Sequence, residues 1–261
     1  MDYQGIRNAT ALGMHLFSFD LKERYAGTFL GMLWLVIHPL FMLLIYAFIF
    51  GEVLQLRSGA SHSTPQFALY LFTGLLAFNA VSEVLVRAPS LLNDRRDLLL
   101  NTPLPVWLLP LLPVAVSVVL EVLALLVLLV ALSVQNELKI SGVFFYFYFL
   151  IIRIIFSLAG AYVIAVLGVF VRDLRQLMPV LMTVLLFVSP ILYPPEVIPE
   201  QFLFFYDWNL LGQLVQGYRE ALLDGIINWG RFSVLFLISI SCLSLAIWLF
   251  RSLMPRARYV L

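Results

Sequence analysis

The stretch from Val106 to Val134, VWLLPLLPVAVSVVLEVLALLVLLVALSV, carries a single charged residue, Glu121. A helix needs ~20 apolar residues to cross the hydrocarbon core of a bilayer, so this stretch can span one as a tilted or protruding helix. Five further apolar stretches flank it: Gly31–Phe50, Phe67–Val86, Val143–Val171, Leu177–Tyr193 and Ser233–Phe250. The sequence therefore predicts an all-α integral membrane protein with six transmembrane helices, the fifth being short and carrying Pro179 and Pro190.

The composition fits a protein whose solvent is hydrocarbon. Of the 261 residues, 62 % are hydrophobic and 12 % charged, about half the usual charged share of a soluble domain. The formal net charge of +1 gives no basis for a nucleic-acid partner, and the lone cysteine, Cys242, excludes an internal disulfide and a cysteine-based metal site. The first 30 residues have no compact apolar core, so no cleavable signal peptide is expected.

The basic residues predict the orientation, because cytoplasmic loops of membrane proteins are enriched in Lys and Arg. With the N-terminus inside, eleven lie in inner segments: Arg7, Lys22, Arg24, Arg87, Arg95, Arg96, Arg172, Arg175, Arg251, Arg256 and Arg258. Four lie in outer segments (Arg57, Lys139, Arg219 and Arg231), and Arg153 lies within a span. Both termini are therefore expected in the cytoplasm.

Residues 1–30 predict an amphipathic helix, which precedes a single membrane domain of residues 31–261. Its polar stripe holds Gln4, Asn8, His15, Ser18 and Lys22. The opposite side is apolar, although Asp20 and Arg24 interrupt it. Two interpretations stay open: the helix anchors the N-terminus at the interface, or its polar face meets a polar substrate at the cytoplasmic mouth of a pathway.

The inner loop between the second and third predicted spans is charged. Asp94, Arg95, Arg96 and Asp97 precede a leucine run that ends before Pro103, which fits a short helix stopped by the proline. Composition alone favours a solvated loop. The alternative is a helix that docks in a groove of a soluble partner.

The outer loop from Pro194 to Gly230 is too apolar for a solvated loop, and its aromatic residues include Phe205, Trp208 and Tyr218. Backbone that enters the membrane without spanning it is tolerated only where protein or a water-filled cavity satisfies its polar groups. The loop therefore predicts short helices that re-enter the outer leaflet or cap an exit.

Two charged residues lie mid-span, where an unpaired charge costs about 3 kcal/mol. The third and fourth spans form a hairpin around position 138, which Glu121 precedes by 17 residues and Arg153 follows by 15. Both side chains thus lie at similar depth on antiparallel neighbours. We predict an intramembrane ion pair with a structural role; the alternative is that one of the two lines a polar pathway.

Aromatic residues form two groups. The run Phe144–Phe149 begins the fourth span and predicts an interfacial belt. Those of the first span include Trp34, Phe41 and Tyr46. They either face lipid and neighbouring helices or form a ladder for sugar rings, whose C–H faces stack on aromatic planes.

The sequence contains no catalytic or nucleotide-binding motif. His15, His38 and His62 lie in different regions without an HExxH or paired-carboxylate motif, and no GxxxxGK[ST] phosphate loop occurs. The chain itself is therefore expected to hold no metal or cofactor. If it transports, its energy comes from another subunit.

Six motifs stand out in chain order: Asp20–Trp34 (DLKERYAGTFLGMLW) with His38-Pro39-Leu40, Arg172–Gln176 (RDLRQ), Ser189–Tyr193 (SPILY), Ile198-Pro199, Trp208–Leu211 (WNLL) and Gly217–Glu220 (GYRE). Together they resemble the ABC-2 type permeases, and within these the branch that exports O-antigen, capsule and teichoic-acid polymers. The family often has an Asn-Pro pair where this chain has Asn209-Leu210. This departure is expected to alter only a local turn.

The resemblance implies the permease subunit of an ATP-driven exporter that moves a lipid-linked surface polysaccharide such as O-antigen across the bacterial inner membrane, as part of lipopolysaccharide biosynthesis. It implies a homodimer with two copies of a separate ABC ATPase, which binds ATP and Mg²⁺, so that this chain is not itself an enzyme. The polysaccharide, its lipid anchor and membrane lipids are the other implied partners.

The resemblance also implies roles for individual segments. The N-terminal helix is the gate helix at the cytoplasmic entrance (His15, Lys22, Arg24, Tyr25), and Asp94–Pro105 contains a coupling helix that docks on the ATPase (Asp94, Arg95, Arg96, Asp97). The outer loop forms the periplasmic gate helices (Phe205, Trp208, Tyr218). The first and fifth spans line the pathway (Trp34, Phe41, Tyr46, Tyr193). For the inner loop, this implication replaces the solvated-loop interpretation.

Two other functions remain open at this point. Within the same fold, the chain could export drugs or lipids, although such exporters lack the long aromatic outer loop in this form. From another class, a membrane enzyme acting on lipid-linked sugars would need clustered acidic or histidine residues at one membrane face. Asp94 with Asp97 is the only candidate pair for that chemistry.

Overall fold

The computed structural model describes residues 3–49, 64–101, 105–194, 198, 201 and 203–260. Within these ranges the chain forms helices joined by turns and irregular segments, without a β-strand. Five helical segments are long and apolar enough to cross a membrane: Gly31–Ile49, which contains η1 (Gly31–Leu33) and α2 (Trp34–Tyr46), then α3 (Thr64–Arg87), α6 (Leu111–Val134), α7 (Ile140–Phe170) and α11 (Trp229–Val260). The predicted all-helical fold class with several apolar spans is confirmed.

The fifth predicted span is a shorter apolar helix, α8 (Leu174–Val188). It ends before Pro190 because a proline disfavours helical backbone in the residue that precedes it; Ser189 is extended, with φ −80° and ψ 145°. The third predicted span starts with the single turn η4 (Val106–Leu108), and α6 begins only after Pro110.

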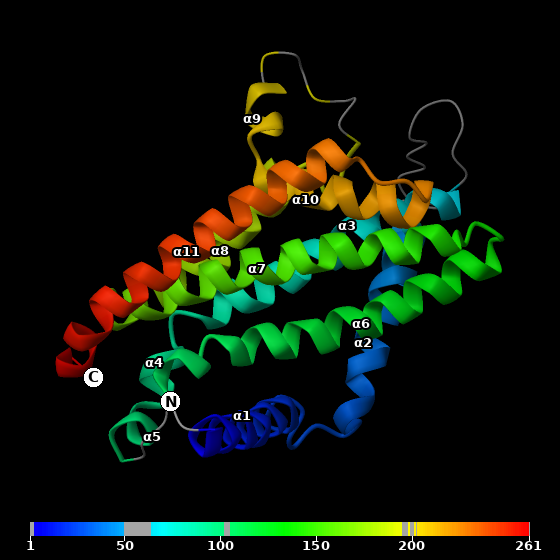
Figure 1. Cartoon of the computed structure of the whole chain (residues 1–261). Coiled ribbons are helices and arrows are strands. Elements are labelled where there is room, and N and C mark those ends of the chain that lie inside the picture. Colours follow the sequence, from blue (N-terminus) through cyan, green and yellow to red (C-terminus); the bar gives the residue numbers. More distant parts are fainter. Residues whose placement is uncertain are drawn as a thin grey trace.

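Helix α7 lies at the centre of the bundle (Figure 1). It packs most extensively against α11 and also contacts α3, α6 and α10 (Leu210–Arg219). One buried apolar cluster fills the space among α3, α6, α7 and α10, and a second lies where α7 meets α11 and α4 (Leu91–Asp94). Helix α2 stands apart, since 6 % of its apolar window is buried, compared with 67 % for α3.

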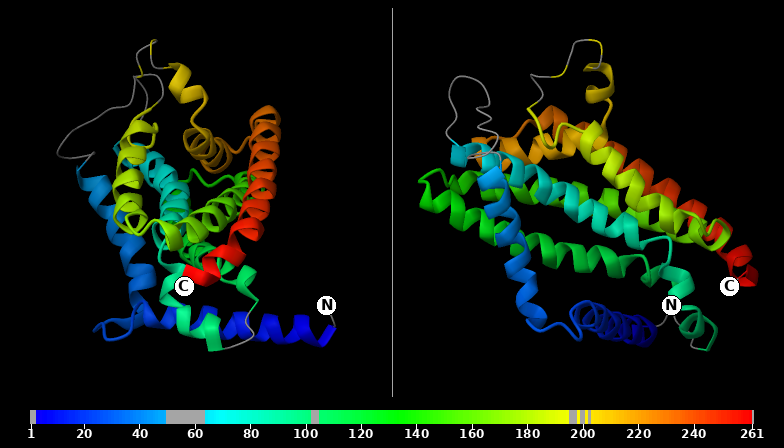
Figure 2. Two further views of the ribbon diagram at one scale, coloured as in Figure 1. Left: turned by 90° about the vertical axis from the view of Figure 1, so that its left-hand side faces the viewer. Right: turned by 180° about the vertical axis from the view of Figure 1, so that it is seen from behind.

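Helix α1 (Tyr3–Glu23) lies crosswise at the foot of α2 (Figure 2). The chain turns between them at Gly27 and Gly31, whose φ angles of 77° and 52° lie in the left-handed region that glycine adopts without strain. Helices α1, α4 and α5 (Arg96–Asn101) and both chain ends lie at one end of the molecule, which we call the termini end. Helices α9 (Leu203–Asp207) and α10 lie at the other, which we call the loop end.

Candidate functional site

A cavity of about 730 Å³ lies between α2, α3, α6 and the connection that follows α1. Its lining mixes aromatic, apolar and polar side chains, among them Arg24, Tyr25, Thr28, Trp34, His38, Tyr46, Asn79, Ser82, Glu83, Ser117 and Glu121. The volume is in the range of small-molecule sites in proteins. Aromatic planes beside amide, hydroxyl, imidazole and carboxylate groups suit a ligand with both C–H faces and hydroxyls.

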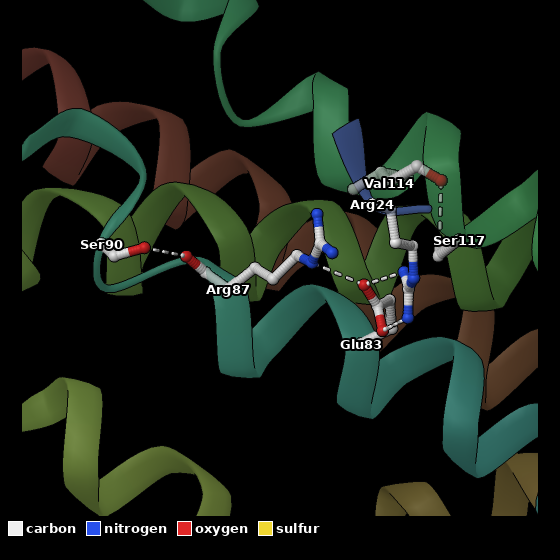
Figure 3. Close-up of polar contacts among 6 residues, drawn as sticks. All are labelled: Arg24, Glu83, Arg87, Ser90, Val114 and Ser117. Atoms are coloured by element: carbon white, nitrogen blue, oxygen red, sulfur yellow. Dashed lines mark hydrogen bonds and ion pairs between the residues drawn. The ribbon is translucent and has the colours of Figure 1, made fainter. Parts of the chain in front are cut away.

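Three charged side chains, Arg24, Glu83 and Arg87, cluster near the end of α3 (Figure 3). Arg24 and Glu83 line the cavity there, at the part that we call its mouth. Arg24 donates two hydrogen bonds to the carboxylate of Glu83, 2.5 Å from Nη1 to Oε1 and 2.9 Å from Nη2 to Oε2. Arg87 places its Nε 2.7 Å from the same Oε1, so two positive charges share one negative charge. Burial lowers the pKa of Arg24, but the hydrogen bonds and charge of Glu83 outweigh it and raise that pKa above its ordinary value.

The four residues assigned to a gate helix do not form one group. Arg24 and Tyr25 line the cavity, whereas His15 and Lys22 are exposed on α1 and do not line it. The cavity contacts therefore come from the connection directly after α1. The exposed side of α1 that holds His15 and Lys22 does not line the cavity.

The structure also divides the aromatic residues expected along a pathway. Trp34 and Tyr46 line the cavity, whereas Phe41 is 57 % exposed and does not line it. Tyr193 lies beyond the end of α8, and its hydroxyl donates to the backbone carbonyls of Phe187 and Val188 at 3.1 and 3.3 Å. These are carbonyls that the end of a helix leaves without an intrahelical partner, so Tyr193 caps α8.

A buried charged network adjoins the cavity, which Glu121 and Ser117 line. Glu121 on α6 and Arg153 on α7 form an ion pair, with both side chains fully buried. The hydroxyls of Tyr146 and Tyr218 donate to Oε1 of Glu121 at 3.0 and 2.6 Å, and Arg153 donates from Nη1 to Ser117 Oγ at 2.9 Å. A buried carboxylate is costly unless it is paired and hydrogen-bonded; here three donors hold it, and they join α6, α7 and α10.

The structure does not bring the three residues assigned to a periplasmic gate together. Phe205 and Trp208 are exposed at α9, whereas Tyr218 on α10 is fully buried beside Glu121. The reason is that α10 packs closely against α7. A Cβ at Gly217 would lie 2.3 Å from the ring of Phe149, so the small residue permits this approach.

Sequence reasoning missed the structural role of Arg219, which it counted as a charge of an outer segment and as part of the GYRE motif. The buried guanidinium donates to the carbonyls of Pro190 (2.8 Å) and Ile191 (2.6 Å) and to the hydroxyl of Tyr70 (2.7 Å), and it lies 3.6 Å from the centre of the Tyr70 ring. Arg219 thus holds α3, the end of α8 and α10 together. The sequence signal that could have pointed to this role is that Arg219 belongs to the GYRE motif and its partners Pro190 and Ile191 belong to the SPILY motif.

The start of α10 explains the departure at Asn209-Leu210. Asn209 caps the helix, since its Oδ1 accepts from the backbone N–H of Gly212 at 3.0 Å, and its Nδ2 donates to Ser189 Oγ at 2.8 Å. Leu210 occupies the first helical position, where proline is favoured but not required. The leucine therefore leaves the start of the helix intact.

The charged inner loop forms two short helices, α4 and α5, on either side of Arg95. Arg95 forms an ion pair with Asp20 on α1, and Asp94 lies 3.7 Å from Arg175 at the start of α8. Burial raises the pKa of Asp20, although the charge and hydrogen bond of Arg95 act in the opposite direction. The Asp20–Arg95 pair thus attaches the loop to α1, and the connection that follows α1 lines the cavity.

The other two charged residues of this loop form no ion pair within the described ranges. Arg96 and Asp97 are exposed, while Pro103 lies outside the described residues. Within the ranges that the structure describes, no group of three or more His, Cys, Asp or Glu side chains is arranged to hold a metal ion.

Comparison with known proteins gives consistent matches along the chain. The ABC-2 type transporter family matches residues 13–223. The O-antigen export system permease protein RfbA of Myxococcus xanthus is 31 % identical over 182 residues, which cover 70 % of this chain and 68 % of that protein. A protein of the same name from Klebsiella pneumoniae is 26 % identical over 93 % of this chain and 92 % of its own length. The polysialic acid transport protein KpsM of Escherichia coli is 26 % identical over 82 % of each chain.

Proposed function

The chain belongs to the ABC-2 type transporter family, and from this premise we propose that it is the permease subunit of an ATP-driven exporter of a lipid-linked surface polysaccharide such as O-antigen. The names of its relatives support the substrate class, because they describe export of O-antigen and transport of polysialic acid. The cavity suits the same class, since it offers Trp34 and Tyr46 beside polar groups that can meet sugar hydroxyls.

One series of contacts carries the proposal. Arg95, in the loop assigned to ATPase docking, is paired with Asp20 on α1. One helical turn further on, Arg24 is paired with Glu83 at the mouth of the cavity. A displacement of the docking loop can therefore pass to the cavity mouth through the last turn of α1, where the backbone N–H of Arg24 donates to the carbonyl of Asp20 at 3.3 Å.

In the proposed assembly, α8 also crosses the membrane, as the fifth of six spans. The termini end faces the cytoplasm of a bacterial cell, with the protein in the inner membrane. Two copies of the chain form the channel, and two copies of a separate ATPase dock on the exposed charges of α4 and α5. That ATPase binds ATP with Mg²⁺, and hydrolysis of the ATP supplies the energy. The chain itself performs no chemical step and is not an enzyme.

In the proposed cycle, the mouth of the cavity shifts from a closed to an open state. Closure of the ATPase subunits displaces the docking loop, and the Asp20–Arg95 pair transmits this to α1. The Arg24–Glu83 contact then shifts and opens the cavity to the polymer. Aromatic contacts hold each sugar unit weakly, so that the polymer slides, while the Glu121 network keeps α6, α7 and α10 together.

Co-purification tests the proposal directly. The tagged chain, gently solubilised from its native membrane, is analysed by mass spectrometry beside the variant Arg96→Gln/Asp97→Asn and the control Arg256→Gln. We expect a stoichiometric companion with a GxxxxGK[ST] motif in the wild type and the control, and reduced recovery of it in the loop variant. A clean homo-oligomer without an ATPase would remove the proposed energy source and the docking role together.

A further inference from the structure

A second cavity, separate from the first, lies at the termini end of α11. It is a groove of about 720 Å³ between η4, α7 and the last turns of α11. Its walls include Trp107, Tyr162, Phe250, Arg251, Met254 and Arg258. The hydroxyl of Tyr162 donates to the carbonyl of Trp107 at 2.9 Å, and its ring packs edge-to-face on Phe250 at 5.0 Å between ring centres. The groove is therefore built by fixed contacts, with an apolar floor and two arginines on one wall.

The length of α11 places these arginines at the edge of a bilayer. The residues between Arg231 and Arg251 carry no charge, and 19 helical residues extend about 28 Å. The hydrocarbon core of a bilayer is about 30 Å thick. With this stretch in the core, the guanidinium of Arg251 lies at the level of the lipid phosphates on the termini side, and Arg258, two turns further along the helix, lies among the headgroups.

The charge of this groove is uncompensated. Helix α11 contains no acidic residue, and within the part of the chain that the structure describes no carboxylate lies within ion-pair distance of Arg251 or Arg258. Positions seven residues apart lie on one face of a helix, so both guanidinium groups lie on the same wall. The groove thus offers two charge-assisted donors to an anion.

The aromatic residues around the groove favour a lipid over a soluble partner as its ligand. Trp107 and Tyr259 are exposed at the groove, and aromatic side chains with a polar edge are typical of membrane interfaces. Ile247, about one turn before Arg251 on α11, also lines the groove and is partly exposed, so the apolar lining extends along the helix toward the bilayer core. Basic pockets between membrane helices near the cytoplasmic side are known to bind acidic lipid headgroups.

We propose that this groove binds an anionic phospholipid of the surrounding bilayer. The phosphodiester lies between Arg251 and Arg258, and the acyl chains lie along Trp107 and Ile247. Phosphatidylglycerol and cardiolipin share this chemistry. The site is distinct from the polysaccharide cavity and does not depend on the proposed substrate.

Lipid binding to the purified full chain, with any co-purifying subunit retained, tests the site. Native mass spectrometry and thermal unfolding are measured with phosphatidylglycerol, cardiolipin and phosphatidylcholine, for the wild type and the variants Arg251→Gln/Arg258→Gln and Arg256→Gln. Arg256 is the matched control because it is an exposed arginine of the same helix end that does not line the groove. We expect the wild type and the control to retain the anionic lipids preferentially and to melt at a higher temperature with them.

The double variant should bind the anionic lipids at least about tenfold more weakly, because each lost charge-assisted hydrogen bond corresponds to about a tenfold change or more, while phosphatidylcholine binding stays unchanged. Equal loss in Arg256→Gln would show a diffuse attraction of charges and overturn the site. Displacement of phosphatidylglycerol by an equal amount of a polyprenyl phosphate would assign the groove to a carrier lipid and would also overturn the proposal.

Discussion

Arg24 and Glu83 form a paired contact across the mouth of the cavity, with both terminal nitrogens of the guanidinium facing both carboxylate oxygens, at 2.5 and 2.9 Å. The two residues are 59 positions apart in the sequence. Since Arg24 lies directly after α1 and Glu83 near the end of α3, this contact fixes the position of α1 relative to the bundle.

Replacing Arg24 by lysine should loosen the mouth while keeping its charge. An ammonium group cannot reproduce the two parallel hydrogen bonds of a guanidinium, so we expect a loss of about 1 kcal/mol in stability and a larger fractional loss of polysaccharide export. Thermal unfolding and an export assay measure the two effects. The control is Arg87→Lys, which alters the more exposed partner of Glu83; an equal or greater export defect there would contradict a special role of Arg24.

The buried pair of Glu121 and Arg153 should show strong coupling in a double-mutant cycle. Arg153→Leu alone leaves a buried carboxylate without its countercharge and should cost about 3–5 kcal/mol. Adding Glu121→Leu should recover at least half of this loss. The recovery is incomplete because the hydroxyls of Tyr146 and Tyr218 lose their acceptor. Unfolding in detergent measures the cycle, and a double variant no more stable than the single would disprove the coupling.

Asp20 should make stability depend on pH. Its pKa is raised above 3.8 by burial, so the folded protein holds this proton more tightly than the unfolded chain. The resulting stabilisation is present below pH 3.8 and is lost as the pH rises through the raised pKa. The difference in unfolding free energy between the wild type and Asp20→Asn should therefore fall with rising pH. Thermal unfolding of both proteins from pH 4 to 7 measures this difference; a difference that grows with pH would mean that Arg95 outweighs burial.

The two sides of α2 should differ in export. Trp34 lines the cavity, whereas Phe41 is turned away from it. Loss of one aromatic contact of about 0.5–1.5 kcal/mol predicts a roughly threefold to tenfold slower export for Trp34→Ala and little change for Phe41→Ala. Export rates at matched protein levels decide this. The reverse order would place the polymer on the side of α2 that faces away from the cavity.

Arg219 should be the most sensitive charged position of the outer loop. Arg219→Lys loses contacts to two backbone carbonyls and the Tyr70 ring, and we expect it to cost about 2–4 kcal/mol. Tyr70→Phe removes only the hydroxyl acceptor and should cost about 1 kcal/mol. Unfolding measurements on both variants provide the test. Equal losses would mean that the carbonyl contacts of Arg219 contribute little.

Hydropathy predicted the helices well but could not predict their burial. The segment containing α2 is more apolar than α3, with mean hydropathies of 2.3 and 1.7, yet it is far less buried. In a bilayer, lipid solvates apolar side chains as well as a protein core does, so apolar character does not tell which helix is central. The cavity beside α2 was therefore beyond the reach of the sequence.

Polar residues were predictable where covalent geometry limits the options. Glu121 and Arg153 lie on one hairpin, so counting residues from its turn was enough to pair them. Arg219 and Ile191, or Arg24 and Glu83, come from segments joined by no short turn, and their meeting depends on how the helices pack. Proline placement explains the remaining boundary difference, since Pro190 ends α8 earlier than its apolar run.

ATP-driven translocation in proteoliposomes tests whether this chain is the permease of a polysaccharide exporter. The chain is reconstituted with its co-purified ATPase and a lipid-linked polysaccharide, and arrival of the polymer in the compartment opposite the ATPase is measured with and without ATP, for the wild type and Asp94→Asn/Asp97→Asn. We expect ATP-dependent translocation in the wild type, and a folded double variant in which ATP hydrolysis no longer drives it. Translocation that proceeds equally without ATP, or none with an active ATPase present, would show that the chain is not the permease of an ATP-driven polysaccharide exporter.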